Sequence, residues 1–259
     1  MRTYYSFDVL QKNMNENPFA KGYITGVMVG DGYFWTKNHQ YRFSLEAKDK
    51  DFVDCFSENC VRIGLHVGRF ERTRLHHIKY CGREYSYQQH YYIATVSSKI
   101  AFTIFQQICS DYSQLLQHDF DTIRGFLRGV FDSEGSVTKG YNQHRLGQIS
   151  LKNYDKTLLM MTCEALRKFG IKSSVYQDCL RIFSYKDLVS FKTQIGFSIQ
   201  RKQNKLLLFP NESIRTPILQ QLSQYKLLKN QGLPFKEIAN RLNMNVKTLH
   251  TYRWRYGWD

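Results

Sequence analysis

Asp31 and Glu134 are the two residues in this chain whose setting most suggests chemistry, because each closes one copy of a repeated stretch. Each acid follows small residues spaced four apart and is itself followed by glycine. The five matching positions are related by one constant offset of 103 residues, which marks an internal repeat. The two sets are Gly22, Gly26, Gly30, Asp31, Gly32 and Gly125, Gly129, Ser133, Glu134, Gly135.

Small residues four apart form a flat stripe along one helix face, so two such helices pack closely. The stripes at Gly22, Gly26, Gly125 and Gly129 therefore predict an intramolecular interface. It brings Asp31 and Glu134 together at the negative C-terminal ends of two helices, where both carboxylates need a cation. Carboxylates and nearby carbonyls are ligands for Mg²⁺, which activates water beside a phosphodiester. A single Asp-Gly is usually a polar helix stop, but an acid duplicated at the same place favours a site.

The elements that position these acids repeat as well. Apolar periodicity, capping residues and glycine stops predict, in each half, a helix, two strands, a helix, two strands and a helix. The fold class is therefore α+β, two tandem αββαββα units. We expect Met1 to Phe19 to be a polar surface lead-in. The expected helices are 19–30, 51–63, 98–108, 120–133, 155–169 and 186–195, and the expected strands are 33–36, 41–48, 65–72, 91–97, one from 136, 146–152, 173–177 and 180–183.

A different pattern begins after the second half. Basic residues followed by Pro210 and Pro217 predict an extended basic linker over 197–216. Residues 217–259 then resemble a helix-turn-helix, with helices at 234–242 and 246–256 joined by a turn at Asn243-Met244. The alternative is a three-helix bundle that binds a protein partner. Basic residues on the second helix favour DNA.

The composition points to a polyanionic partner. A net charge of +15 and a pI of about 9.5 accompany 15% aromatic residues, which indicates a folded nucleic-acid-binding protein. No apolar run approaches the roughly 18 residues of a membrane-spanning helix, and the N-terminus lacks a signal-peptide pattern, so we expect an intracellular protein with reduced cysteines. His76, His77 and Cys81 lack a fourth ligand at zinc-finger spacing, so we expect exposed loop residues there.

The two repeated stretches resemble the LAGLIDADG motif of homing endonucleases. Residues 24–32 match the nine positions, as do residues 127–135. The resemblance implies two four-stranded antiparallel sheets forming a saddle on the DNA major groove and a staggered double-strand cut across the minor groove. The eighth-position acid binds metal in that family, which carries over to Asp31 and Glu134. The sixth position, often Asp, is Val29 in one copy and Asp132 in the other, and neither is expected to bind metal.

The resemblance also sorts the remaining site residues. Backbone neighbours Gly30 and Ser133 are expected at the metal, with two or three Mg²⁺ ions that Mn²⁺ or Ca²⁺ replaces. Lys48 and Lys152, at matching strand ends, are expected near the scissile phosphates, although a solvated lysine explains each equally well. The DNA contacts expected on the two sheets are Arg42, Ser44, Glu46, Arg69, Arg72, Arg74, Gln148, Ser150 and Arg181. Those expected outside the resemblance, in the basic linker and the helix-turn-helix, are Arg201, Lys202, Lys247, Thr248, His250 and Arg253.

These observations predict a monomeric, site-specific endonuclease of double-stranded DNA, encoded by a mobile intron or intein-like element, with a long asymmetric target. Its predicted domains are 1–118, 119–196, the linker 197–216 and the helix-turn-helix 217–259. One alternative is a transcription regulator that joins a LAGLIDADG-like domain to a helix-turn-helix and has lost cleavage. Another is an intron maturase, in which the same surface binds RNA.

Overall fold

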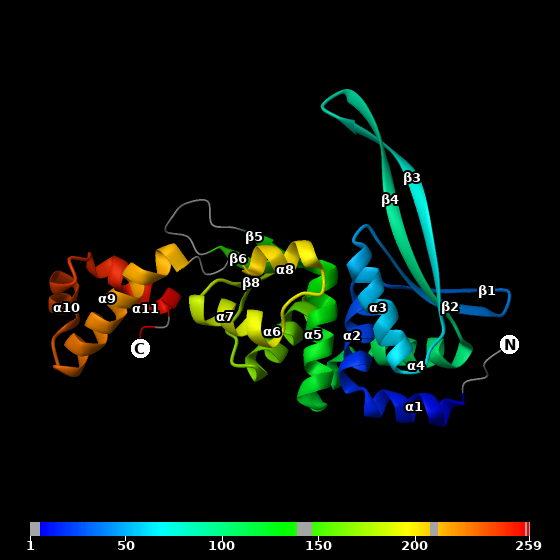
Figure 1. Ribbon diagram of the computed structural model, residues 1–259, viewed down its shortest axis with the longest axis horizontal. Helices are drawn as coiled ribbons and strands as arrows, with labels where there is room; N and C mark the ends of the chain where they lie inside the picture. Colours follow the sequence, from blue (N-terminus) through cyan, green and yellow to red (C-terminus); the bar gives the residue numbers. More distant parts are fainter. Residues whose placement is uncertain (1–5, 139–146, 208–211, 257, 259) are drawn as a thin grey trace. The chain divides into compact units, whose positions relative to one another are not determined.

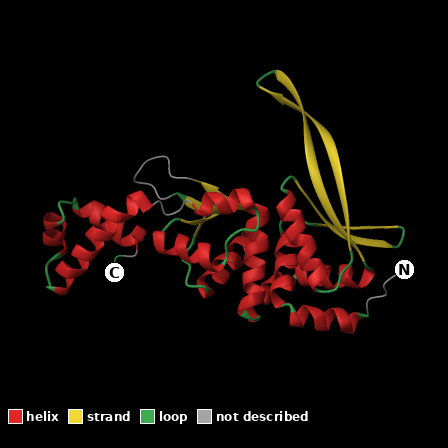
Figure 2. Cartoon of the chain, viewed as in Figure 1, coloured by secondary structure: helices red, strands yellow, loops and turns green. Residues whose placement is uncertain are grey.

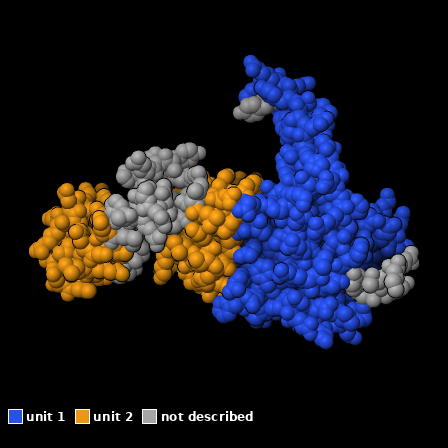
Figure 3. All heavy atoms as spheres, in the orientation of Figure 1, with its two compact units in different colours: residues 1–135, 197–200 blue, residues 136–196, 201–259 orange. Residues whose placement is uncertain are grey.

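The structure is a computed structural model that describes residues 6–138, 147–207, 212–256 and 258 (Figure 1). The chain divides into two compact units (Figure 3). Unit 1 comprises Met1–Gly135 and Phe197–Gln200, and unit 2 comprises Ser136–Gly196 and Arg201–Asp259. The helix that opens the second repeat therefore belongs to the first unit, because it packs against the helix of the first repeat.

The fold is α+β, and both repeats have the same order of elements. The first consists of α2 (Pro18–Val29), β1 (Tyr33–Lys37), β2 (Gln40–Ala47), α3 (Lys50–Arg62), β3 (Val67–Tyr80), β4 (Arg83–Ser97) and α4 (Lys99–Ser110). The second consists of α5 (Phe120–Glu134), β5 (Gly135–Thr138), β6 (Gln148–Lys152), α6 (Lys156–Lys168), β7 (Ser174–Tyr176), β8 (Cys179–Ile182) and α7 (Tyr185–Gln194). A 3-10 helix, Tyr112–Gln117, connects them.

Each repeat forms one four-stranded antiparallel sheet, and the strand order is the same in both, β1-β2-β4-β3 and β5-β6-β8-β7. The β1–β2 hairpin turns at Asn38 and His39, whose φ values of 50° and 59° suit a two-residue turn. Alternation along the strands buries one face, with Phe43 and Leu45 fully inside in the first sheet and Ile149 and Leu151 in the second. The saddle implied by the family resemblance concerns how the two units sit together, and it stays a prediction.

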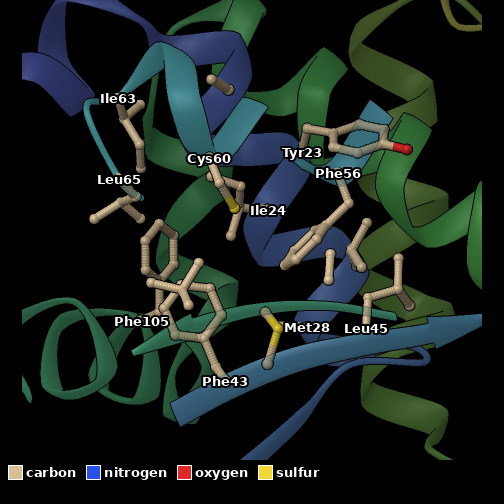
Figure 4. Packing of buried hydrophobic residues seen from close by; sticks show 14 of the residues in the cluster. Tyr23, Ile24, Met28, Phe43, Leu45, Phe56, Cys60, Ile63, Leu65 and Phe105 are labelled. Carbon is tan, nitrogen blue, oxygen red and sulfur yellow. The ribbon is translucent and has the colours of Figure 1, made fainter. Parts of the chain in front are cut away.

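The core of unit 1 lies between its sheet and its helices. Phe43 and Leu45 from β2 meet Phe56 and Cys60 from α3 and Phe105 from α4, and all five are fully buried (Figure 4). Burial raises the pKa of the Cys60 thiol, so this cysteine serves as a small apolar side chain. The apolar side of α2 packs into the same cluster. The helix that carries Asp31 is thereby fixed by the core.

The N-terminal lead-in is a helix, which corrects the expectation for Met1 to Phe19. Helix α1 (Phe7–Glu16) begins at Ser6, whose hydroxyl accepts a hydrogen bond from the backbone N–H of Val9 at 3.2 Å. Leu10 and Met14, four residues apart, are fully buried. Two apolar residues are the whole stripe, which is why the polar segment looked like surface.

The β3–β4 pair is far longer than the sequence predicted. Its fourteen registered pairs run from Val67↔Val96 to Tyr80↔Arg83, and a turn at Cys81-Gly82 closes the hairpin. Figure 1 shows this ribbon projecting beyond β1 and β2 within unit 1. His76 and His77 therefore lie on a strand, which corrects the loop expected there. The described residues contain no cluster of three His, Cys, Asp or Glu side chains that could hold a metal ion.

The segment after the second repeat is helical, which corrects the extended linker. Helix α8 spans Gln200–Leu207, and α9 spans Glu212–Asn230. Two short helices follow, α10 (Phe235–Arg241) and α11 (Val246–Tyr256), separated by a turn in which Asn243 has a φ of 51°. The helical elements appear red in Figure 2. Among the described residues, no helix is both long and apolar enough to cross a membrane.

Candidate functional site

The site is built on the close packing of α2 and α5. A β-carbon placed on Gly22 would lie 2.0 Å from the carbonyl oxygen of Thr122, and one on Gly26 would lie 2.3 Å from that of Phe126. From the other helix, a β-carbon on Gly125 would lie 2.1 Å from the carbonyl oxygen of Phe19, and one on Gly129 would lie 2.4 Å from that of Tyr23. Glycine at these four positions is what lets the two backbones touch.

The acids follow from this packing. At the C-terminal end of the interface, a β-carbon on Gly30 would lie 2.5 Å from that of Ser133, so the ends of the two helices are still in contact there. Asp31 is the next residue after Gly30, and Glu134, the last residue of α5, is the next after Ser133. Both carboxylates therefore start from the same end of the helix pair. That end is the negative end of both helix dipoles, where a cation is stabilising.

The chemistry of the donors at this end fits a hard divalent cation. Asp31 and Glu134 offer carboxylate oxygens, and Gly30 and Ser133 offer backbone carbonyls in the last turns of their helices. Mg²⁺, Mn²⁺ and Ca²⁺ all prefer such oxygen ligands. The Ser133 hydroxyl donates to the carbonyl oxygen of Gly129 at 3.1 Å. The hydroxyl is thus bonded within its own helix, and the backbone carbonyl is the oxygen that Ser133 would offer to a cation.

Asp132, a buried acid, lies beside the site. From the sequence, the expectation for this residue was only that it does not bind metal. Asp132 is 1% exposed, and its Oδ2 accepts a hydrogen bond from the Tyr23 hydroxyl at 2.9 Å. Its Oδ1 accepts from the backbone N–H of Ser198 at 3.0 Å, and the Ser198 hydroxyl donates to Oδ2. Burial, and the charge of Asp132, raise the pKa of Tyr23 well above its ordinary value. Asp132 thereby ties together α2, α5 and the segment after the second repeat.

On the first sheet, Glu46 gathers two of the predicted DNA-contacting arginines. Arg72 donates from Nε to Glu46 Oε1 at 3.0 Å, with a second bond from Nη2. Arg74 donates to Glu46 Oε2 at 3.0 Å. The Glu46 side chain is 12% exposed, whereas those of Arg72 and Arg74 are 44% and 46% exposed. The arginines are therefore held at the surface by one carboxylate.

The same face carries a row of rings that the sequence did not single out. The Lys48 ammonium lies 5.9 Å from the ring centre of Tyr91, and the Arg74 guanidinium lies 5.4 Å from it. The Tyr91 hydroxyl is 3.1 Å from His76 Nε2, and the His76 ring stacks on Tyr87 at 5.2 Å. Cationic and aromatic groups thus alternate along the ribbon. The signal was the run of Tyr and His between 76 and 92, which has no apolar alternation.

Three predicted contacts of the first sheet differ in setting. Arg42 is exposed, with its guanidinium 5.2 Å from the ring centre of Trp35. Ser44 is 3% exposed and shares a hydrogen bond with the Thr95 hydroxyl at 2.9 Å, so the prediction that it contacts DNA is corrected. Arg69 pairs opposite buried Ala94 and donates to Asp54 of α3 at 2.9 Å. Strand alternation therefore places it on the helix-covered face, away from Arg72 and Arg74.

On the second sheet, the predicted residues share the solvent side. Ser150 pairs opposite Arg181, and its hydroxyl lies 2.8 Å from that of Ser136. Lys152, at the end of β6, forms an ion pair with Asp178 at 3.4 Å. Gln148 is half-buried and Arg181 is exposed. Lys152 belongs to unit 2, whereas Asp31, Glu134 and Lys48 belong to unit 1, so a shared role for the two lysines stays a prediction.

Beyond the sheets, the predicted contacts divide. Arg201 is exposed on α8, whereas Lys202 lies on the inward side of that helix and is 6% exposed. The prediction that Lys202 contacts DNA is corrected. On α11, Lys247 and Thr248 are exposed, and the Lys247 backbone N–H donates to Asn245 Oδ1 at 2.9 Å. His250 and Arg253 instead line a hollow in unit 2.

Comparison with known families covers both repeats. Residues 121–196 match the model of the LAGLIDADG-like domain, and residues 20–80 match that of the WhiA LAGLIDADG-like domain. The chain carries two LAGLIDADG-like domains. The first range contains Glu134 and the second contains Asp31, as the resemblance of the motifs predicted. The resemblance of residues 24–32 and 127–135 to the LAGLIDADG motif is confirmed.

Curated relatives leave the activity open. An uncharacterized protein of Methanocaldococcus jannaschii is 29% identical over 235 residues, covering 75% of this chain and 77% of that protein. A second uncharacterized protein of that organism is 29% identical over 170 residues, and the match covers 64% of this chain and 60% of that protein. A probable translation initiation factor IF-2 of Pyrococcus furiosus is 31% identical over 109 residues. That match covers 41% of this chain but only 10% of that protein, so it says nothing of translation.

The similar solved structures include two homing endonucleases, I-DmoI and I-WcaI, and the protein WhiA. I-DmoI in complex with DNA and Mn has a TM-score of 0.46 and 16% identity, covering 69% of this chain and 96% of that one. The homing endonuclease I-WcaI bound to its DNA recognition sequence has a TM-score of 0.47 and 14% identity, and the match covers 74% of this chain and 91% of that one. Full-length DUF199/WhiA from Thermatoga maritima has a TM-score of 0.48 and 15% identity, and the match covers 97% of this chain and 95% of that one. Likenesses at this level carry no conclusion about activity.

Proposed function

We propose that this protein is a metal-dependent endonuclease that cuts both strands of double-stranded DNA at a specific site. The observation that carries the proposal is the pair Asp31 and Glu134, delivered to one end of a glycine-mediated helix interface. A helix pair needs no acids at that end to pack. Two carboxylates where both helix dipoles are negative are costly without a cation, which favours a functional reason for both.

Asp31 and Glu134, with the backbone carbonyls of Gly30 and Ser133, are the residues that would hold the metal. Bound Mg²⁺ supplies charge that activates water and stabilises the leaving oxygen of the phosphodiester. Lys48 is proposed to orient the scissile phosphate in the first half and Lys152 in the second. Each polar sheet face is proposed to contact the major groove, where arginine reads guanine, through Arg42, Arg72 and Arg74 or through Gln148, Ser150 and Arg181.

A second candidate is a DNA-binding regulator that does not cut. Residues 20–80 match the WhiA LAGLIDADG-like domain, and two short helices with a tight turn follow at the C-terminus. Retention of an acid in both repeats favours the nuclease, because a protein that only binds has no need of either. The two candidates make the same prediction for binding and opposite ones for cleavage.

The experiment begins by selecting bound duplexes from a random library with the full-length chain in Ca²⁺. The selected duplex is then incubated with Mg²⁺, and both strands are followed on a denaturing gel. The wild-type chain is expected to cut both strands. Asp31→Asn and Glu134→Gln are each expected to lose about 1000-fold or more in cleavage while affinity changes by less than about threefold.

The matched control is Asp121→Asn, which neutralises an exposed acid on the same helix α5 and leaves cleavage unchanged. A selected duplex that is bound tightly and never cut, in Mg²⁺ or Mn²⁺, identifies the regulator. Cleavage that persists in Asp31→Asn or Glu134→Gln shows that the acids are wrongly assigned.

A further inference from the structure

A hollow of about 660 Å³ lies within unit 2, on the second LAGLIDADG-like half where α11 lies against it. Its walls come from the loop after α6, the end of β8, the start of α7 and one side of α11. The volume is within the range of about 300–1,000 Å³ that small-molecule sites occupy. All of its lining residues belong to unit 2, shown in orange in Figure 3.

The hollow is positively charged. Lys172, Lys186 and Arg253 line it together with His250. Both lysines are exposed, and neither ammonium forms an ion pair with any residue that the structure describes. The guanidinium of Arg253 lies 5.5 Å from the ring centre of Phe235 on α10, and the His250 ring lies 4.4 Å from that ring. One aromatic side chain thus positions two of the nitrogen-bearing groups.

The single acid in the wall does not cancel this charge. Asp187 is 5% exposed, and its Oδ1 accepts a hydrogen bond from the backbone N–H of Lys172 at 2.8 Å. Its Oδ2 accepts from the Ser184 hydroxyl. The carboxylate therefore serves to fold the wall. Three cationic side chains, Lys172, Lys186 and Arg253, face this one acid, so the lining favours a ligand with negative charge.

An aromatic pair closes one side of the hollow. The rings of Phe183 and Trp254 lie 4.6 Å apart at an angle of 40°. The indole is nevertheless 62% exposed, so most of its surface is open to a flat partner. Aromatic rings stack on nucleobases whatever the base, and cationic side chains bind phosphate. The combination suits one ligand chemistry better than a simple anion or a simple ring.

We propose that this hollow binds a nucleotide, its phosphate at Lys172, Lys186 and Arg253 and its base against Trp254. The site goes beyond cleavage and does not depend on Asp31 or Glu134. Two sources share this chemistry, a free nucleotide and a nucleotide unit of a nucleic acid strand. It also explains why His250 and Arg253 line the hollow instead of forming an open recognition surface with Lys247.

The test uses the full-length chain in metal-free buffer, so that cleavage plays no part. AMP, inorganic phosphate and a random-sequence duplex are titrated while tryptophan fluorescence and duplex anisotropy are recorded. The test variant is the double change Lys172→Ala/Lys186→Ala. Its control is Lys156→Ala/Lys229→Ala, which removes the same charge from exposed positions of unit 2 outside the hollow. Trp254→Phe assigns the fluorescence signal, and circular dichroism verifies that every variant folds.

If the ligand is a free nucleotide, AMP quenches the tryptophan fluorescence saturably. Phosphate competes with AMP, but it binds with lower affinity than AMP does. The quench is absent in Trp254→Phe, weakens about tenfold or more in Lys172→Ala/Lys186→Ala and is unchanged in the control. For a strand, AMP has no effect, but Lys172→Ala/Lys186→Ala weakens duplex binding at least threefold more than the control does. If AMP does not bind and the two double variants bind duplex equally, the proposal is overturned. Because metal is absent, that result leaves the nuclease untouched.

Discussion

Tyr23 on α2 donates a hydrogen bond to Asp132 on α5, and the two residues that the repeat would place in the mirrored pair are Phe126 and Val29. The offset of 103 residues relates Tyr23 to Phe126 and Val29 to Asp132. The buried polar pair therefore has no counterpart at the mirrored positions, where both residues are apolar. The internal symmetry of the helix pair is broken at this point.

Replacing Asp132 by Asn tests the role of this pair. The amide keeps one acceptor but turns a second donor toward Ser198, which leaves a buried N–H without its partner. We expect the free energy of unfolding to fall by about 1–3 kcal/mol, measured by urea denaturation. Asp121→Asn, an exposed change on the same helix, is expected to stay within about 0.5 kcal/mol. Equal effects of the two changes would contradict the buried role.

Gly26→Ala tests the interface itself. The added β-carbon would lie 2.3 Å from the Phe126 carbonyl oxygen and 2.9 Å from the Val130 nitrogen, so the backbones must move apart. In an isolated helix this change is stabilising, whereas here we expect a loss of about 1–3 kcal/mol or more by thermal unfolding. Thr103→Ala, an exposed position of α4, raises helix propensity without a clash and is expected to be neutral or slightly stabilising. A stabilised Gly26→Ala variant would refute the close packing.

Glu46→Gln tests whether this carboxylate restrains the arginines of the sheet. Without its charge, Arg72 and Arg74 are free to meet phosphates, so affinity for random-sequence duplex should rise by about threefold and its salt dependence should steepen. Fluorescence anisotropy at several salt concentrations measures both. Glu71→Gln removes the same charge from the opposite face of the ribbon, where Glu71 lies 3.2 Å from His90, and should change affinity less. The reverse ranking would place the DNA on the other face.

Asp119 provides a pH-dependent prediction at the start of α5. Burial alone would raise the pKa of Asp119, but hydrogen bonds from the Thr122 backbone and hydroxyl outweigh it and hold the pKa below its ordinary 3.8. A lowered folded-state pKa stabilises the protein fully above the unfolded value, and this contribution is lost as the pH falls through the folded value.

We therefore expect Asp119→Ala to cost about 1 kcal/mol at pH 7, and the gap to wild type to narrow below pH 3.8. Asp119→Asn keeps the cap without the charge, so it should retain most of the stability at pH 7. Urea unfolding from pH 2.5 to 7 checks both variants. A gap that widens in acid would reverse the assigned direction of the pKa.

The repeat allowed the sheets, the helix pair and the two acids to be predicted, since glycine spacing and apolar alternation are local signals. The ribbon beyond Thr73 could not be, because its strands are stabilised by each other and by Tyr and His rings, with no core to impose alternation. Helix α8 was missed for a related reason, since Lys202 is buried only through tertiary packing. The predicted DNA contact of Ser44 was wrong because the polar face of a sheet is not uniformly exposed, and Ser44 is buried on it.

The short segment Phe197–Gln200 has a consequence for synthesis of the chain. It belongs to unit 1, where Ile199 is 1% exposed in the core and Ser198 donates to Asp132, yet the residues before and after it belong to unit 2. A nascent chain that has emerged as far as Gly135 therefore lacks part of the first core. Unit 1 can complete its core only after residue 200 leaves the ribosome, when the strands of the second repeat have already been synthesised. Folding of the first unit is thus coupled to synthesis of four residues that lie beyond the second repeat.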